Sequence, residues 1–298
     1  MVVSPEISAT WRTVEDARRI KRLSRRAKEI MVVGAGLVSM QIADALRRPG
    51  VHLTFVVGSR QILGQNVDED CAAIIQGQTA SVSGSTFLFG RNVVHIERSR
   101  GGYKALLDTG EELAADMVIV GKGVEPNTQL ARTSGIRVNK GILVDQFMRT
   151  NVDGVYAAGD VTEGRNRVTG DAEPVPNGIN ACEQGRIAGL NMAGGEETFE
   201  GSLAENVTHL FGLDVAAIGV TKVKYANEHS EETRVVNLER KLYRKMVVRG
   251  NRLVGAILLG DIRDIGIIHN VIAHSIDISP FKSRIAKMPL NFARDILV

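Results

Sequence analysis

The sequence predicts an α/β protein, and three observations carry this prediction. The chain has 298 residues and is 44% apolar, so it is long enough to build more than one hydrophobic core. A continuous apolar run, Ile30 to Val33, leads into a glycine-containing turn and then a helical pattern through Ile42 and Leu46. A second apolar run follows from Val51 to Val57, which completes the order strand, turn, helix and strand.

An amphipathic helix is predicted ahead of the first strand, from Thr13 to about Lys28. Thr13 and Asp16 have the spacing of a capping box. Four residues form an apolar stripe: Ala17, Ile20, Leu23 and Ala27. The other face carries seven basic residues: Arg18, Arg19, Lys21, Arg22, Arg25, Arg26 and Lys28. A nucleic-acid patch is the alternative, but we interpret this face as solvated, because charge runs on helices are usually exposed.

The remaining elements divide the chain into four parts: a linker and basic helix over 1–28, a nucleotide-binding domain over 29–120, a middle region over 121–198 and a C-terminal region over 199–298. Strands of the nucleotide-binding domain are predicted at 86–89, 93–97, 104–107 and 117–120. The middle region has strands at 142–144 and 155–158, a loop at 164–178 and a helix at 179–192. The C-terminal region has strands at 215–220, 235–238, 245–248 and 253–259, and a helix at 264–274.

Composition excludes several classes of function. The 37 basic and 34 acidic residues give a net charge of +3, and aromatic residues make up only 4%, so we expect neither a nucleic-acid partner nor a membrane partner. Cys71 and Cys182 match no metal or disulfide spacing, which favours two buried thiols in a reducing cytoplasm over redox-active cysteines. Neither a G-x-S-x-G elbow nor an H-E-x-x-H motif occurs, and His269 and His274 do not share a helical face. We therefore expect no metal site and no catalytic side chain of these kinds.

The turn after the first strand carries the clearest chemical signal. Gly34, Gly36 and Ser39 follow the pattern G-x-G-x-x-G with serine in the third position, and Leu37 and Val38 complete the motif. In this pattern the first glycine allows a tight turn and the second lets the backbone approach a pyrophosphate at the helix N-terminus. Serine is small enough to preserve the close packing of the helix. The motif predicts a Rossmann-like NAD(P)-binding domain, and a purely structural turn is the alternative.

The end of the second strand departs from the usual pattern. An acidic residue commonly binds the adenosine ribose hydroxyls there, but the chain has Val57, then Gly58, Ser59 and Arg60. Ser59 and Arg60 are suited to a 2′-phosphate, which predicts that NADPH is used at least as well as NADH. Weak binding of either coenzyme is the alternative.

Five motifs together resemble the two-dinucleotide flavoprotein reductases, a family that includes rubredoxin and ferredoxin reductases, NADH oxidases and the flavin module of nitrite reductases. These motifs are Arg12 to Ala17, Gly34 to Ser39, Gly121 to Asn127, Val155 to Asp160, and Pro176-Asn177 leading into Glu183 to Arg186. The resemblance implies an NAD(P)-binding domain inserted in a partial FAD-binding domain and followed by an α+β interface domain. It also implies that the N-terminal FAD-binding half lies outside this chain.

The resemblance further implies cofactor contacts outside the glycine turn. Gly159 and Asp160 resemble the turn whose carboxylate receives the flavin ribityl chain, with Asn177 and Gln184 around the start of the following helix. Gly121, Gly123 and Pro126 resemble the crossover that passes the nicotinamide. Considered alone, Asp160 is compatible with an ordinary turn residue and Gln184 with a surface amide. Gln41, where the family often has glutamate, is a departure from the family pattern, as is Ser39.

The family resemblance also implies a function for the chain. The chain is expected to be part of an enzyme, a cytoplasmic FAD-dependent NAD(P)H oxidoreductase, in which hydride passes from NAD(P)H to FAD and electrons pass to an acceptor. Its expected partners are NAD(P)H, a subunit with the N-terminal FAD half, a redox protein or small-molecule acceptor, and a second copy of the chain. One rival is a nucleotide-binding or interaction protein that has lost flavin chemistry. A dehydrogenase without flavin is another, but no acid/base pair supports it.

Overall fold

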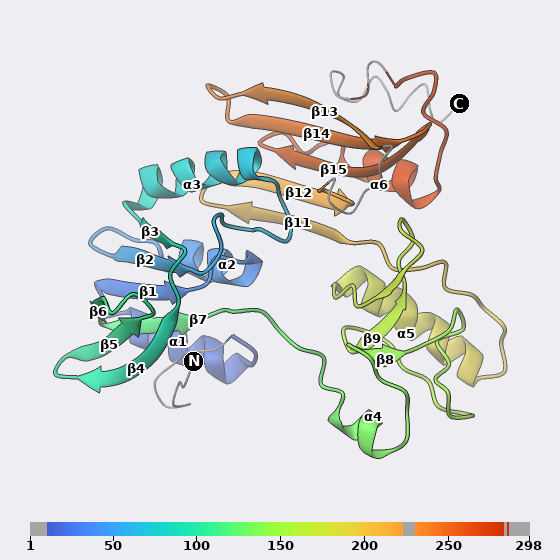
Figure 1. Cartoon of the computed structure of the whole chain (residues 1–298), viewed down its shortest axis with the longest axis horizontal. Coiled ribbons are helices and arrows are strands. Elements are labelled where there is room, and N and C mark those ends of the chain that lie inside the picture. Colours follow the sequence, from blue (N-terminus) through green and yellow to red (C-terminus); the bar gives the residue numbers. More distant parts are fainter. Residues whose placement is uncertain (1–10, 223–229, 283–284, 286–298) are drawn as a thin grey trace. The chain divides into compact units, whose positions relative to one another are not determined.

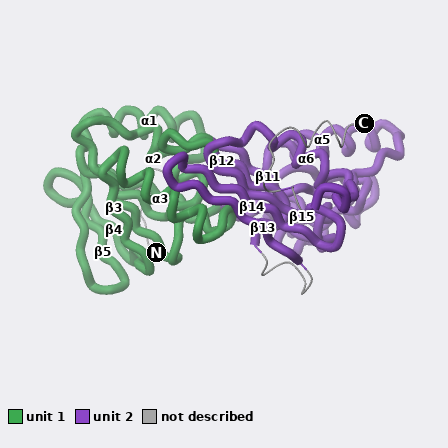
Figure 2. The backbone as a smooth tube through the Cα atoms, turned by 90° about the horizontal axis from the view of Figure 1, so that it is seen from above, with its two compact units in different colours: residues 1–123, 209–214 green, residues 124–208, 215–298 purple. Residues whose placement is uncertain are grey.

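The computed structural model describes residues 11–222, 230–282 and 285, and it consists of two compact units (Figures 1 and 2). The first unit contains residues 1–123 and 209–214, and the second contains 124–208 and 215–298. An α/β organisation is confirmed, since parallel strands with helices precede an antiparallel sheet in the chain. The four domain ranges drawn from the sequence stay predictions.

A parallel four-stranded sheet forms the centre of the first unit, in the order β3-β2-β1-β7. Its strands are β1 (Glu29–Val33), β2 (His52–Val57), β3 (Thr86–Phe89) and β7 (Met117–Val120). An antiparallel sheet of β4 (Val93–Ser99), β5 (Gly102–Leu107) and β6 (Glu112–Ala115) packs against it through a shared apolar core that includes Val33, Val56 and Ile96. Most residues of β1 and β2 are buried, as expected for strands of a parallel sheet.

Two helices connect these parallel strands, and only the first was predicted. Helix α2 (Leu37–Leu46) agrees with the sequence pattern, whereas α3 (Glu69–Ser83) was missed. The α3 signals are nevertheless present in the sequence. Asp68 caps the helix by accepting from the Cys71 N–H at 3.2 Å, and Gly84 ends it with a φ of +63°.

Helix α1 (Val14–Ser24) has the predicted capping box, formed by Thr13 and Asp16, but it is shorter than predicted. The prediction for Leu23 was wrong, because its side chain is 38% exposed. Ser24 is buried instead, with Ile20 one turn before it and Ala27 after it. Its hydroxyl donates to the Lys21 carbonyl within the helix, which makes burial of a polar residue tolerable.

The middle of the chain contains short strands and a long helix. These elements are α4 (Gln129–Thr133), β8 (Ile142–Leu143), β9 (Thr162–Arg165), β10 (Ala172–Glu173) and α5 (Gly178–Met192). The strand predicted at residues 155–158 was wrong: within the described chain, only Tyr156 makes an isolated bridge, to Arg149, so no neighbouring strand supports a ladder there. The predicted loop at 164–178 was also partly wrong, because β10 pairs with the end of β9 in a hairpin.

The C-terminal region contains a five-stranded antiparallel sheet, in the order β11-β12-β15-β14-β13. Its strands are β11 (Glu205–Leu210), β12 (Leu213–Gly219), β13 (Ser230–Asn237), β14 (Leu242–Arg249) and β15 (Arg252–Leu259). Helix α6 (Ile265–Ala273) packs on one face, where Ile268 and Val271 contact a core that includes Met246. The predicted elements here are confirmed, although β13 begins five residues before the predicted strand at 235–238, and β11 is additional.

Both cysteines are free thiols in different environments. Cys71 is buried in α3, and burial raises the pKa of its thiol far above the ordinary value. Cys182 is exposed, so the prediction of two buried thiols was wrong for this residue. Over the ranges that the structure covers, no helix is long and apolar enough to cross a membrane.

Candidate functional site

Gly34, Ser39 and Gly121 are brought together at the end of β1. Gly34 has a φ of +99°, and a Cβ atom there would lie 2.4 Å from the Gly121 carbonyl oxygen. The Ser39 hydroxyl donates to the same oxygen at 3.1 Å, and a Cβ atom on Gly121 would lie 2.1 Å from that hydroxyl. Ser39 is 1% exposed. The predicted close packing is therefore confirmed, and Gly34 and Gly121 are glycines for steric reasons.

Gly36 serves a different purpose. A Cβ atom on Gly36 would meet nothing within 4 Å, and its φ of −76° is ordinary for any residue. It precedes α2, whose first turn has no acidic residue and no side-chain capping bond. Gly36 and Val38 are exposed and Leu37 is half-buried. The start of this helix is thus exposed and has no side-chain cap, an arrangement that fits the pyrophosphate of a dinucleotide.

The end of β2 presents basic groups beside this turn. Val57 is buried, whereas Ser59 and Arg60 are exposed. The Leu63 N–H donates to the Ala35 carbonyl at 2.8 Å, so the loop after β2 returns to the glycine turn.

Arg91 is a second basic residue at this position, and the sequence reading missed it. Its backbone N–H donates to the Val57 carbonyl at 3.2 Å, and the Gly90 N–H donates to the Ser59 carbonyl at 3.3 Å. Two arginines, Arg60 and Arg91, therefore follow adjacent parallel strands at the same edge of the sheet. A signal was available, because Arg91 follows the predicted strand at 86–89 just as Arg60 follows the preceding one.

The second predicted contact region lies in the second unit, around Gly159. Gly159 has a φ of +87°, and its N–H donates to Gln184 Oε1 at 2.7 Å. The same oxygen accepts from the Thr162 hydroxyl at 3.0 Å, and Gln184 Nε2 donates to the Ser202 hydroxyl at 3.1 Å. Gln184 is 3% exposed, so its amide holds the Gly159 turn from inside the protein.

Asp160 and Asn177 have contrasting environments. Asp160 is exposed, and within the residues that the structure covers its carboxylate has no hydrogen-bond partner. Asn177 caps α5 by accepting from the Asn180 N–H at 2.8 Å, and its Nδ2 donates to the Leu203 carbonyl at 2.9 Å. Asp160 is thus free to bind a hydroxylated ligand, while Asn177 and Gln184 set the backbone around it. Their assignment as cofactor contacts stays a prediction.

Gly123 and Pro126 fall on opposite sides of the division between the units. Gly123 is exposed with a φ of +95°, and Pro126 is half-buried in the second unit. Gly121 is the residue of this predicted crossover that contacts the glycine turn. The roles of Gly123 and Pro126 near the nicotinamide stay predictions.

Glu163 is a structural carboxylate that sequence reading missed. It is 3% exposed and accepts from Asn139 Nδ2 at 2.8 Å and from the N–H groups of Lys140 at 2.8 Å and Gly141 at 2.9 Å. Burial alone would raise the pKa of Glu163, but these hydrogen bonds outweigh burial and lower it below the ordinary value. Ionised Glu163 therefore fixes β8 beside β9, next to the Asp160 turn.

The lowered pKa of Glu163 predicts a pH-dependent contribution to stability. Its stabilisation is present above the pKa of the unfolded chain, about 4.3, and is lost as pH falls through the lower folded-state pKa. Glu163→Gln should lower the free energy of unfolding at pH 7 by about 1–3 kcal/mol. Urea unfolding should also show a smaller difference between variant and wild type below pH ~4 than at pH 7. A difference that does not shrink on acidification would contradict the role of the ionised carboxylate.

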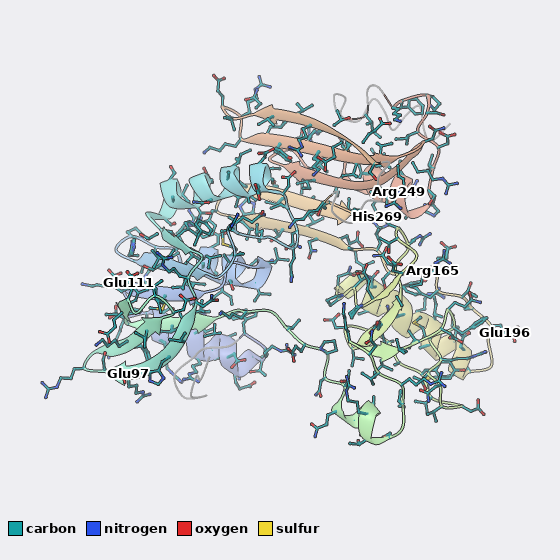
Figure 3. All side chains as sticks on the ribbon, in the orientation of Figure 1. Glu97, Glu111, Arg165, Glu196, Arg249 and His269 are labelled. Atoms are coloured by element: carbon teal, nitrogen blue, oxygen red, sulfur yellow. The ribbon has the colours of Figure 1, made fainter. Side chains whose placement is uncertain are left out.

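His269 lies on α6 (Figure 3), and no chemical signal in the sequence marked it. Its Nδ1 lies 2.8 Å from Glu205 Oε2. Glu205 Oε1 is buried without a hydrogen-bond partner in the part of the chain described. No group of three or more His, Cys, Asp or Glu side chains among the described residues is placed to hold a metal ion.

Comparison with known proteins adds two family matches. Residues 4–185 match the model of the family described as pyridine nucleotide-disulphide oxidoreductase, and residues 206–276 match the rubredoxin NAD+ reductase C-terminal domain. The chain is 31% identical over 290 residues to the NADH-dependent phenylglyoxylate dehydrogenase subunit epsilon of Aromatoleum evansii, covering 96% of this chain and 68% of that one.

Two further comparisons bear on length and fold. The chain is 29% identical to the assimilatory nitrate reductase electron transfer subunit of Bacillus subtilis, covering 85% of this chain but 32% of the relative, so it spans about a third of that protein. An engineered water-forming NADPH oxidase, derived from the Lactobacillus brevis NADH oxidase, shares the fold with a TM-score of 0.85 at 19% identity. That match covers 99% of this chain and 72% of the solved one.

Proposed function

Because the chain belongs to the pyridine nucleotide-disulphide oxidoreductase family, we propose that it binds NAD(P)H and passes its reducing equivalents, through FAD, to an electron acceptor. Members of this family use FAD and NAD(P)H. The observation that carries the proposal is the turn at Gly34, where two glycines and Ser39 interlock while Gly36 leaves the start of α2 open.

The residues of this chain fit both NAD(P)H and FAD. For the nucleotide, the open helix start can hold the pyrophosphate and the arginines after β2 and β3 can hold the adenosine end. For the flavin, the Asp160 carboxylate lacks a partner within the described ranges and lies on a turn fixed by Gln184, which suits hydroxyl groups of the ribityl chain. When bound, FAD supplies the hydride-accepting and electron-passing chemistry.

The chain's own residues position cofactors rather than transfer protons. Gly34 and Gly121 bring the backbone of β1 and β7 close together, and Ser39 fixes the helix that faces the pyrophosphate. In the second unit, Gln184 holds the Gly159 N–H next to Asp160, and Glu163 holds the segment from Asn139 to Gly141 beside β9. Such positioning roles agree with an enzyme in which the protein binds and orients the cofactors and the cofactors perform the chemistry.

NADPH is the coenzyme we propose, because Arg60 and Arg91 follow β2 and β3 where the acidic residue of NADH-binding turns is missing. We expect wild-type kcat/KM for NADPH to equal or exceed that for NADH. Arg60→Ala and Arg91→Ala should each lower kcat/KM for NADPH about 10-fold and leave NADH nearly unchanged. A strong preference of the wild type for NADH would contradict the assignment.

The partners and the compartment complete the proposal. A redox protein or small molecule accepts the electrons, and additional flavin contacts come from a segment that resembles the N-terminal FAD-binding half. We also propose a cytoplasmic location and self-association through the C-terminal sheet.

The proposed activity is tested by NADPH-dependent reduction of ferricyanide in the presence of added FAD. Turnover that requires both FAD and the protein supports the proposal. A protein that binds NADPH but never accelerates reduction would favour the rival, a nucleotide-binding protein without flavin chemistry.

A further inference from the structure

Basic residues are concentrated on α1 to a degree that the rest of the chain does not match. Residues 12–28 contain eight of the 37 lysines and arginines and two of the 34 acidic residues. This stretch therefore has a formal charge of +6, whereas the whole chain has +3. The positive charge of the protein is thus localised, and the remaining sequence is slightly acidic.

The helix geometry places this charge on one surface. Ile20, Ser24 and Ala27 form the buried side, at the spacing of one helical face. Five exposed basic residues lie away from this buried side: Arg18, Lys21 and Arg22 on α1, and Arg25 and Arg26 in the turn that directly follows it. We call this set the α1 basic surface.

The α1 basic surface is poorly neutralised. Within the described residues, Lys21, Arg22, Arg25 and Arg26 make no ion pair, and Arg18 makes an exposed one with Glu15 at 3.5 Å. Basic side chains also repeat at spacing i, i+4, and each such pair destabilises an isolated helix by about 0.2–0.5 kcal/mol.

Some exposed arginines elsewhere are paired with a nearby carboxylate, whereas Arg98, Arg100 and Arg137 make no ion pair within the described residues. Arg47 lies 3.1 Å from Asp44, Arg186 lies 2.8 Å from Glu183, and Arg263 lies 2.7 Å from Asp261. An uncompensated surface on a helix that otherwise has a capping box and an acidic first turn points to a negatively charged partner.

We propose that the α1 basic surface docks an acidic electron-carrier protein. The inference rests on the proposed function, since an NAD(P)H oxidoreductase must meet an acceptor. A protein acceptor fits this surface better than nucleic acid does, because only 4% of the residues are aromatic and the net charge outside the helix is negative. Charge complementarity of this kind mainly raises the association rate and selects the partner.

The test uses an acidic [2Fe–2S] ferredoxin as the probe and measures its dissociation constant at about 20 mM and about 500 mM salt. The first variant combines Arg22→Glu, Arg25→Glu and Arg26→Glu. A charge-matched control combines Arg98→Glu, Arg100→Glu and Arg137→Glu, three exposed arginines outside α1. Circular dichroism and NADPH titration verify that each variant is folded and still binds nucleotide. The neutral set Arg22→Gln, Arg25→Gln and Arg26→Gln replaces the first variant if that variant does not fold.

We expect the α1 variant to weaken ferredoxin binding at least ~10-fold at low salt, while the control changes it less than ~3-fold. High salt should weaken wild-type binding and remove most of the difference. Equal losses in both variants would overturn the proposal, as would a wild type that does not bind ferredoxin at low salt. Tighter binding of duplex DNA or phosphatidylserine vesicles than of ferredoxin would also overturn it. NADPH titration separates these outcomes from failure of the proposed function, which would appear as absent nucleotide binding in the wild type.

Discussion

Gly36→Val should abolish most NAD(P)H affinity and leave the fold intact. Valine is compatible with the backbone at this position, where φ is −76°, and its Cβ atom would meet nothing within 4 Å. Its side chain would occupy the space in front of α2 that the pyrophosphate needs. We expect the dissociation constant for NADPH to rise at least ~100-fold, or about 2.8 kcal/mol. Isothermal titration and a thermal melt on the same preparation measure both effects.

Gly34→Ala is the matched control, because it should lose stability as well as binding. The added Cβ would lie 2.4 Å from the Gly121 carbonyl oxygen at a φ of +99°, so the backbone of β1 or β7 must move. A Gly36→Val protein that is folded and binds NADPH normally would show that the glycines serve packing alone.

Gln184→Leu should destabilise the second unit and disturb the Asp160 turn. Leucine has nearly the same volume, but it leaves the Gly159 N–H without its acceptor and removes the donor to Ser202, whereas the Thr162 hydroxyl retains the Gly159 carbonyl as acceptor. Buried polar groups that lose a partner cost about 1–3 kcal/mol each, so we expect a total loss of about 2–4 kcal/mol in urea unfolding.

Gln184→Glu provides the comparison, because it retains an acceptor oxygen for Gly159 and Thr162. It should recover part of the stability that Gln184→Leu loses. A Gln184→Leu protein whose free energy of unfolding lies within about 0.5 kcal/mol of wild type, which is the usual scatter of surface substitutions, would contradict the role assigned to the amide.

The sequence was most informative where burial and turn chemistry act over a few neighbouring residues. The capping box at Thr13 and the close packing of Ser39 depend on contacts that a short pattern specifies, and both are confirmed. Strands β3 and β7 were predicted with the observed ends, because each coincides with a short apolar run of the sequence, although only β7 is mostly buried.

Other features depend on partners distant in sequence. Residues 155–158 are apolar enough for a strand, yet a strand also needs a neighbour, and Tyr156 has only an isolated bridge to Arg149 in the described structure. Glu163 is defined by backbone N–H groups more than 20 residues earlier, and Gln184 by Gly159 and Ser202 on either side of it in the chain. No local pattern in the sequence reveals that these two side chains are buried and fully engaged.

The visible absorption spectrum of the native protein, recorded before and after anaerobic addition of NADPH, tests the central claim most directly. The protein should be isolated from its own host, so that any polypeptide that completes the flavin site is retained. We predict the absorption bands of a bound flavin and their loss on addition of about one equivalent of NADPH per flavin, because one hydride reduces one flavin. A preparation that saturates with NADPH but has no flavin bands, or whose bands do not bleach, would contradict the account.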